Sequence, residues 1–198
     1  KLTADSGLTL GSTASGSIAV ASITDANSDS AGVLTLLATK AGATVTFLTG
    51  ASVFNKGVVV QAAKGIAVQQ DVSSVDGAIS LDGDSNDSPD SQDTITTADG
   101  VAITSGTVLT LTATSGLVPA GKLTLAAKTG VYIADSLTLY AASNKALVIN
   151  ADSDSTGNSG TLTVVSTKTV TSTKSDVTIT AFDIDMAGSL TAGTAALT

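Results

Sequence analysis

Apolar and polar residues alternate along most of the chain, as in VLTLLA, ATVTFL and ALVIN. A period of two places the apolar side chains on one face of a β-strand. Gly, Asn, Asp or Ser separates these runs at short intervals, and no segment shows the 3.6-residue period of a helix. We therefore predict short strands at 33–38, 43–48, 57–62, 65–69, 78–82, 107–113, 122–127, 136–141, 146–150, 161–165 and 176–181.

Many short strands are compatible with a sandwich, a barrel or a β-solenoid. Aromatic residues make up only 3% of the chain, while 42% is apolar, so the core must be built from Leu, Val, Ile and Ala. Such slim side chains stack well in the narrow core of a solenoid. We predict one all-β domain over residues 1–198, a parallel β-helix of about eight to ten coils with roughly 20 to 25 residues each.

Three stretches of the chain resemble one another, which is typical of repeat architectures. Each contains an apolar strand, an Asp-rich loop and a Thr-bearing strand. The stretches are 17–36, 78–97 and 146–164, and their starts lie 61 and 68 residues apart. This similarity favours the solenoid over the other two folds.

Two segments combine a strand with a Gly-Ser-Leu-Thr-Ala-Gly or similar turn: ITAFDIDMAGSLTAGTAALT (179–198) and VLTLTATSGLVPAGKLTLAA (108–127). They resemble the repeats of filamentous haemagglutinin-like adhesins. Very long Asp/Gly/Thr-rich repeat proteins of marine microbes are similar in the same sense. The resemblance implies a right-handed parallel β-helix with a surface or filament role.

The charged residues are all Asp or Lys, with a net charge of −8 and a pI near 4.1. Binding to nucleic acid or to an anionic membrane requires clustered Lys and Arg, and no such cluster exists. No apolar run approaches the roughly 20 residues of a membrane helix. We therefore predict neither a nucleic-acid partner nor membrane insertion.

Acidic residues concentrate in three loops, and their alternation suggests calcium. A calcium loop places oxygen ligands at alternating positions so that they converge on one ion. An EF-hand proper is excluded, because Asp87 stands where that motif has Gly, Asp93 stands where it has Glu, and flanking helices are absent. Alternatively, Asp, Asn and Ser in these loops bond their own backbone in a hydrated turn. The candidate ligands are Asp82, Asp84, Asn86, Ser88, Asp90 and Asp93 in one loop, Asp152, Asp154 and Thr156 in another, and Asp25, Asn27 and Asp29 in the third.

Catalysis has few candidate residues, because the chain lacks His, Glu, Cys and Arg. We predict that the protein is not an enzyme and assign no catalytic residue. The alternative is a carbohydrate-active or carbohydrate-binding β-helix using Asp183 and Asp185, which would lie on one strand face about 6 to 7 Å apart. We favour a solvated strand face or a turn-capping pair, because no aromatic platform for a sugar accompanies the two carboxylates.

Thr pairs that flank one apolar residue suggest another alternative. Stacked Thr-x-Thr pairs resemble the ice-binding surface of antifreeze proteins. That function requires one pair per coil, whereas these pairs are irregularly spaced and also fit the ordinary β-propensity of Thr. The pairs are 44/46, 94/96, 110/112, 161/163, 169/171 and 178/180.

The leading functional hypothesis is a structural or adhesive segment of an extracellular filament or cell-surface protein. Lys1 is not preceded by Met, and we expect a processed chain or a piece of a longer repeat protein. A solenoid without polar caps presents unpaired strand edges. We therefore predict that further copies of the chain stack on it head to tail. A surface polysaccharide is a further predicted partner. Calcium bound in the acidic loops would stiffen the rod.

Overall fold

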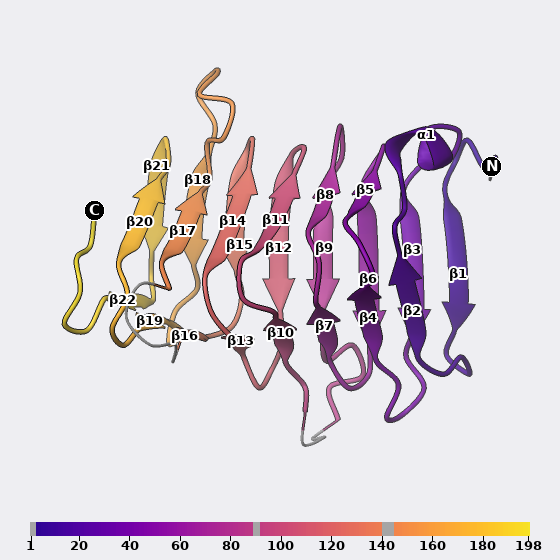
Figure 1. The fold of residues 1–198 in the computed structure, drawn as a ribbon, viewed down its shortest axis with the longest axis horizontal. Coiled ribbons are helices and arrows are strands. Elements are labelled where there is room, and N and C mark those ends of the chain that lie inside the picture. Colours follow the sequence, from indigo (N-terminus) through magenta and orange to yellow (C-terminus); the bar gives the residue numbers. More distant parts are fainter. Residues whose placement is uncertain (1–2, 89–91, 140–144) are drawn as a thin grey trace.

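The protein is a β-solenoid in a computed structural model that describes residues 3–88, 92–139 and 145–198. Within these ranges the regular structure is almost entirely β-strand, and α1 (Asp25–Ser28) is a single helical turn. The strands form three parallel sheets that wind through about seven turns (Figure 1). The predicted parallel β-solenoid is confirmed.

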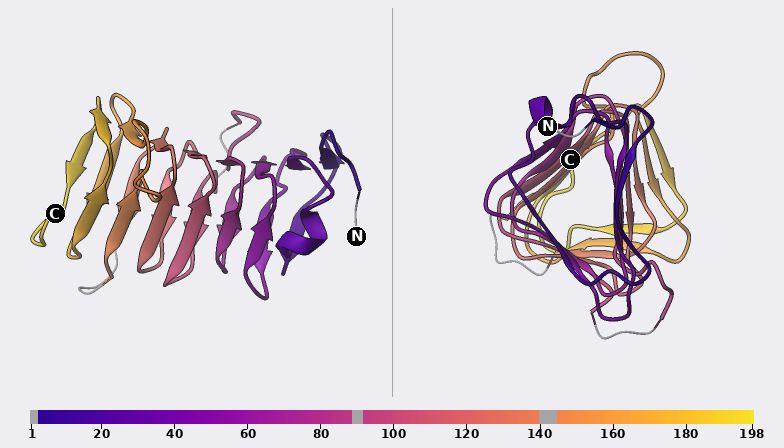
Figure 2. Two further views of the ribbon diagram at one scale, coloured as in Figure 1. Left: turned by 90° about the horizontal axis from the view of Figure 1, so that it is seen from above. Right: turned by 90° about the vertical axis from the view of Figure 1, so that its right-hand side faces the viewer.

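Each sheet takes one strand from successive coils, and the chain visits sheets 1, 2 and 3 in turn around a three-sided cross-section (Figure 2). Sheet 1 contains β1 (Leu8–Ser12), β3 (Leu34–Ala38), β6 (Val58–Ala62), β9 (Ile79–Asp82), β12 (Val108–Thr112), β15 (Gly130–Ile133), β18 (Thr161–Val164) and β21 (Asp183–Met186). Sheet 2 contains β2 (Ile18–Ala21), β4 (Val45–Leu48), β7 (Ile66–Val68), β10 (Ile95–Thr97), β13 (Leu117–Pro119), β16 (Leu137–Leu139), β19 (Thr169–Ser172) and β22 (Ser189–Thr191). Sheet 3 contains β5 (Ser52–Phe54), β8 (Val72–Ser74), β11 (Val101–Ser105), β14 (Leu123–Ala127), β17 (Leu147–Asn150) and β20 (Val177–Thr180).

The core is a set of aliphatic ladders. Alternate residues of strands such as β6 and β14 are buried, as the period-two pattern requires. Because neighbouring strands pair in register, inward residues of successive coils stack directly on one another. One such row in sheet 1 consists of Leu10, Leu36, Val60, Leu81, Leu111, Ile133, Val164 and Met186.

The corner from sheet 3 to sheet 1 is narrow and is held by buried serines. The Ser74 hydroxyl donates to the Gly77 carbonyl at 2.6 Å, and the Ser105 hydroxyl donates to the Val108 carbonyl at 2.8 Å. A Cβ on Gly77 would lie 1.6 Å from the Lys56 carbonyl oxygen of the preceding coil, so only Gly fits there. These serines satisfy backbone groups that the turn removes from the sheets.

Coil length varies because the corners vary, while the strands stay in register. Val58 pairs with Ile79, 21 positions later, whereas Ile79 pairs with Leu109, 30 positions later. The longer coil contains the acidic loop that follows β9. About seven turns are therefore present instead of the predicted eight to ten, since long corners consume residues that the prediction assigned to further coils.

All eleven predicted strands correspond to observed strands. Strands outside the predicted ranges include β5 and β8, which have three residues each, and also β1 and β11, which have five. The predicted right-handed winding stays a prediction.

Replacing Leu111 by Ala should lower the free energy of unfolding by about 2 to 5 kcal/mol, because it leaves a cavity in a fully buried ladder. The measurement is urea denaturation followed by circular dichroism. Val108→Ala on the same strand is the control, since Val108 is 37% exposed and should change stability by less than about 1 kcal/mol. Equal losses in the two variants would contradict the ladder as the source of stability.

Candidate functional site

The three acidic loops lie at two corners of the coil, because Ser28 of the α1 loop accepts the Asn55 N–H at the end of β5, in the same sheet as β17, while the loop after β9 lies at another corner. The loop with α1 joins β2 of sheet 2 to β3 of sheet 1, the loop after β9 leads from sheet 1 to sheet 2, and the loop after β17 leads from sheet 3 to sheet 1 (Figure 2). The similar stretches of sequence therefore do not occupy one fixed position in the coil.

The loop after β9 is built from side chains that bond their own backbone. A carboxylate oxygen of Asp82 accepts the N–H of Asp84 at 3.2 Å, and the Asn86 side chain accepts the N–H of Ser88 at 3.2 Å. Asp87 lies between them with a φ of 49°, a left-handed conformation that Asp tolerates in turns. The alternating oxygens thus hold two consecutive Asx-turns.

The loop after β17 repeats this arrangement 68 positions later. The Asn150 side chain accepts the N–H of Asp152 at 3.2 Å, and Asp154 accepts the N–H of Thr156 at 3.2 Å. Ser155 takes the left-handed place with a φ of 52°. The bond to the Thr156 side chain is the main cause that lowers the pKa of Asp154 below its ordinary value. These two loops share one local structure although they sit at different corners.

Both loops are also tied to the preceding coil. Ser85 donates its N–H to the Ala62 carbonyl at 3.0 Å, and Ser153 donates its N–H to the Ala127 carbonyl at 2.9 Å. Each serine follows the Asp at the centre of its loop. The loop centre is therefore held against the end of a strand in the coil below.

The central aspartate of each loop carries a buried oxygen without a donor. Asp84 is only 5% exposed, and its Oδ1 has no hydrogen-bond partner. Oδ1 of Asp152 is likewise buried and without a partner, and so is the Ser85 hydroxyl. Burial without a hydrogen bond is costly for a carboxylate oxygen. The alternation of oxygen-bearing residues could be read from the sequence, but the burial of these carboxylate oxygens could not.

Carboxylates crowd around Asp82. Its pKa is raised above the ordinary value chiefly by burial, and the charges of Asp84, Asp87 and Asp135 raise it further. Lys168, which comes from a later coil, forms its ion pair with Asp135. The negative charge at this corner is therefore only partly balanced by Lys168.

The other predicted ligands are dispersed. Asp93 is buried at the far end of its loop, Asp90 lies outside the described residues, and Ser88 is exposed. Among the residues that the structure describes, no three acidic side chains are grouped so that they could share a metal ion. The predicted set of six ligands is therefore not assembled within these ranges.

The first acidic loop forms a helical turn instead of an open loop. Thr24 caps α1 by accepting the N–H of Asn27, and Asp25 accepts the side-chain amide of Asn55 at 2.6 Å. Asp29 is the C-cap residue. Residues two apart on a helix face different directions, so this arrangement does not bring the oxygens of Asp25 and Asn27 together.

Single aspartates outside the three acidic loops link successive coils, which the sequence reading missed. Asp135 accepts the Ala113 N–H of the preceding coil at 2.8 Å and the Lys168 ammonium of the following one. Asp99 accepts the Lys122 N–H at 2.8 Å and also pairs with Lys145. The only sequence signal is an isolated Asp between two strands, which is common in any loop.

The outer face of sheet 2 carries two charge-free rows of small residues. These rows include three of the six predicted Thr pairs, 44/46, 94/96 and 169/171. The pairs are aligned by the register of the parallel strands, although their spacing in the sequence is irregular. One row reads Ala19, Thr46, Ala67, Thr96, Val118, Thr138, Thr171 and Thr191.

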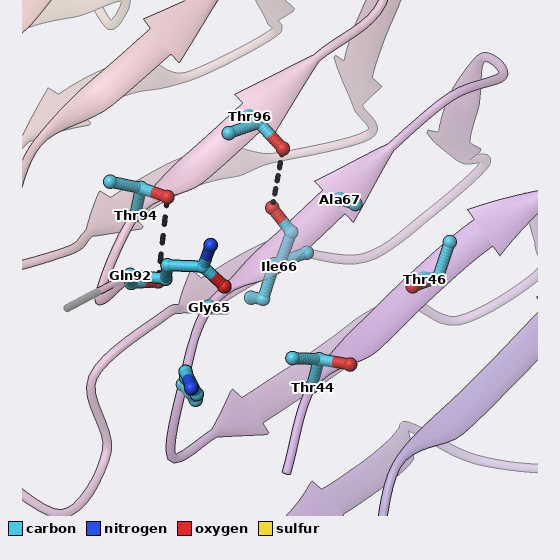
Figure 3. Close-up of a pocket in the computed structure, with 9 residues that line it drawn as sticks. Thr44, Thr46, Gly65, Ile66, Ala67, Gln92, Thr94 and Thr96 are labelled. Atoms are coloured by element: carbon cyan, nitrogen blue, oxygen red, sulfur yellow. Dashed lines mark hydrogen bonds between the residues drawn. The ribbon is translucent and has the colours of Figure 1, made fainter. Parts of the chain in front are cut away.

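A groove of about 260 Å³ interrupts this face where Gly65 and Ala67 replace larger residues. Thr46 and Thr96 line its two sides, and the Gln92 side chain extends over Gly65 (Figure 3). The lining is mostly hydroxyl and methyl groups, together with the side chains of Lys64 and Gln92 and without an aromatic ring. Such a surface can offer hydrogen bonds, but it has no stacking platform for a sugar.

Asp183 and Asp185 lie exposed on the outer face of β21, beside Thr161 and Thr163 of β18. Neither carboxylate has a side-chain partner among the described residues. Exposed carboxylates without a cleft are not positioned for acid–base chemistry.

Comparisons with models of protein families, with curated proteins and with solved structures gave no match. The resemblance to filamentous haemagglutinin-like adhesins therefore stays a prediction. Within the described ranges, no helix has the length and apolar character needed to cross a membrane.

Asp99→Asn should destabilise the protein at neutral pH but not in acid. The hydrogen bond from Lys145 is the main cause that lowers the pKa of Asp99 below 3.8. A lowered pKa means that the carboxylate adds stability above the unfolded-state value, and that this stability is lost as pH falls through the folded-state pKa. Urea midpoints of both proteins at about pH 7 and about pH 2.5 test this.

The control is Asp183→Asn, which removes an exposed carboxylate without such a partner and should leave the midpoint nearly unchanged at both pH values. If Asp99→Asn lowers the urea midpoint as much at about pH 2.5 as at about pH 7, the ionised Asp99 carboxylate is not the source of this stability.

Proposed function

We propose that the chain is a structural, adhesive segment of an extracellular filament or cell-surface protein whose copies associate end to end. The observation that carries this proposal is the arrangement of the first and last strands among the described residues. Within these ranges, the end strands of sheets 1 and 2 each pair on one side only, whereas the end strands of sheet 3 are covered by other segments of the chain. A surface polysaccharide is the partner we propose for the adhesive role.

At the first coil, β1 and β2 each pair with one neighbour among the described residues. Leu10 points toward the core yet is 41% exposed. The first strand of sheet 3, β5, is instead covered by α1 and by the Ile23 carbonyl, which accepts the Val53 N–H at 2.8 Å. An incoming coil would therefore dock on sheets 1 and 2.

The last coil has the matching arrangement. Ile184 of β21 continues the inward row but is 57% exposed. Sheet 3 is covered here too, because residues 196–198 run along β20 and Ala196 accepts the Val177 N–H at 2.9 Å. Both open faces thus combine unpaired backbone groups with apolar side chains. A strand of another chain can pair with such a surface.

The rows fit one another across such a junction. If β21 of one copy pairs with β1 of the next in the register used throughout sheet 1, Ile184 stacks on Leu8 and Met186 stacks on Leu10. On the outer face, Asp185 then lies beside Thr9 and meets no second carboxylate. Aliphatic residues meet aliphatic ones, and like charges do not oppose each other.

Ile184→Lys should abolish end-to-end association, because it places a charge in the apolar junction. Analytical ultracentrifugation and negative-stain electron microscopy of the 198-residue chain measure this, and we expect rods several times longer than one copy for the unmodified protein. Tyr132→Lys is the matched control, since Tyr132 is 40% exposed on the outer face of a middle coil. A monomeric unmodified chain at high concentration would overturn the proposal.

Ice binding is the second candidate function, and the aligned rows of sheet 2 favour it. Register brings Thr pairs into parallel rows about 4.8 Å apart along the rod and about 7 Å apart along each strand. The face carries no charge in these rows. Ala67 and Val118 interrupt the Thr row, which limits the regular surface to short stretches.

Thermal hysteresis of the purified chain tests this second function. Thr96→Lys on sheet 2 should abolish hysteresis, whereas Thr124→Lys on the outer face of sheet 3 should leave it unchanged. Ala67→Thr should increase hysteresis, because it extends the Thr row. Freezing and melting at the same temperature in the unmodified chain would exclude ice binding.

A further inference from the structure

We propose that the two matching acidic loops, 82–88 and 150–156, each bind a calcium ion through a buried, unpaired carboxylate oxygen of the central aspartate, Asp84 or Asp152. This goes beyond end-to-end association and does not depend on it, because both loops lie on corners away from the end coils. The proposal also replaces the alternating set of ligands by one buried oxygen in each loop.

The first argument is recurrence. Asp84 and Asp152 stand at the same point of two loops with the same hydrogen bonds, and both have an Oδ1 with less than 1 Å² exposed and no donor. A single such oxygen could be an accident of packing. The same oxygen in two separate corners indicates that the local structure leaves it for a ligand that donates positive charge.

The second argument is that no group among the described residues donates a hydrogen bond to Oδ1 of Asp84. Asp84 is only 5% exposed, so bulk water does not reach its Oδ1 freely. The Ser85 hydroxyl beside it is also buried without a partner and can supply a second oxygen. A buried carboxylate must be paired with a cation or a hydrogen-bond donor to remain charged.

The third argument is the local charge. Asp82 and Asp87 lie on either side of Asp84 in one tight turn, in which Asp82 accepts the Asp84 N–H at 3.2 Å and the Asp84 carbonyl accepts the Asp87 N–H at 3.3 Å. Lys168 is engaged by Asp135. A divalent ion would relieve this repulsion. The second loop has fewer carboxylates, with Asp152 and Asp154 in its turn, so we expect it to bind more weakly.

The chemistry of the ligands selects calcium. All of the ligand atoms are oxygens, which suits hard cations, and a site with few protein ligands must complete its shell with carbonyls and water. Calcium accepts such irregular shells, whereas magnesium requires a near-ideal octahedron. No three acidic side chains are grouped among the described residues, so we expect weak binding, with dissociation constants of about 0.1 to 1 mM.

Isothermal titration of the metal-stripped 198-residue chain with calcium chloride tests the stoichiometry. We expect two sites, of which Asp84→Asn removes the tighter and Asp152→Asn the weaker. Asp183→Asn removes the same charge from an exposed strand and should retain both sites. Titration with magnesium chloride should give at least tenfold weaker binding.

Thermal melting separates a calcium ligand from a purely structural aspartate. In EDTA, Asp84→Asn should melt at the same temperature as the unmodified chain or higher, because it removes an unpaired buried charge. In 5 mM calcium the order should reverse, since only the unmodified chain gains stability from the ion.

Each outcome decides the proposal. Calcium that changes neither heat nor melting temperature overturns it and leaves a buried water as the partner of Oδ1. If the unmodified chain binds only one calcium ion, and that site is lost in Asp84→Asn but kept in Asp152→Asn, the proposal fails for loop 150–156 alone. Equal loss of affinity in Asp183→Asn would show that net charge, and not the loops, binds the ion.

Discussion

The stacking of one strand directly on the next, in unbroken parallel register, is the constraint on which this structure depends. Backbone hydrogen bonds run along the rod from coil to coil, and they fix which side chains meet. Because register is kept through seven successive pairings in sheet 1, the inward side chains form continuous aliphatic rows. The hydrophobic core is therefore a product of the backbone pairing, with Leu, Val and Ile suited to its narrow width.

The corners contain the features that strands paired in register cannot accommodate. Most of the described charged residues, the loops of different length and the helical turn α1 occur there, with Asp183 and Asp185 on β21 among the exceptions. Corner aspartates such as Asp99 and Asp135 accept backbone N–H groups from neighbouring coils, so these acidic residues help to hold the coils together. The alternation of oxygens in 82–88 has the same origin, because Asx-turns need an acceptor at every other position.

Period-two alternation was enough to predict the fold, because each strand buries one face and most strands are long enough to show it. Strand length alone does not decide which strands the pattern reveals, because three-residue β7 was predicted whereas five-residue β11 was not. The position of an acidic loop around the coil depends on the summed lengths of all corners before it, which local sequence does not determine. The burial of Asp84 and the alignment of the Thr pairs on sheet 2 follow from packing between coils, so neither could be read from spacing alone.

The freedom of the corners has a consequence for how such a chain can change. Coils of 21 and 30 residues coexist with the same strand pairing, so a segment inserted at a corner projects outward without shifting any side chain of the core. The rod can thus act as a scaffold on which new surface peptides are displayed one by one. Insertion within a strand has the opposite effect, because a shift of one residue would exchange the inner and outer faces.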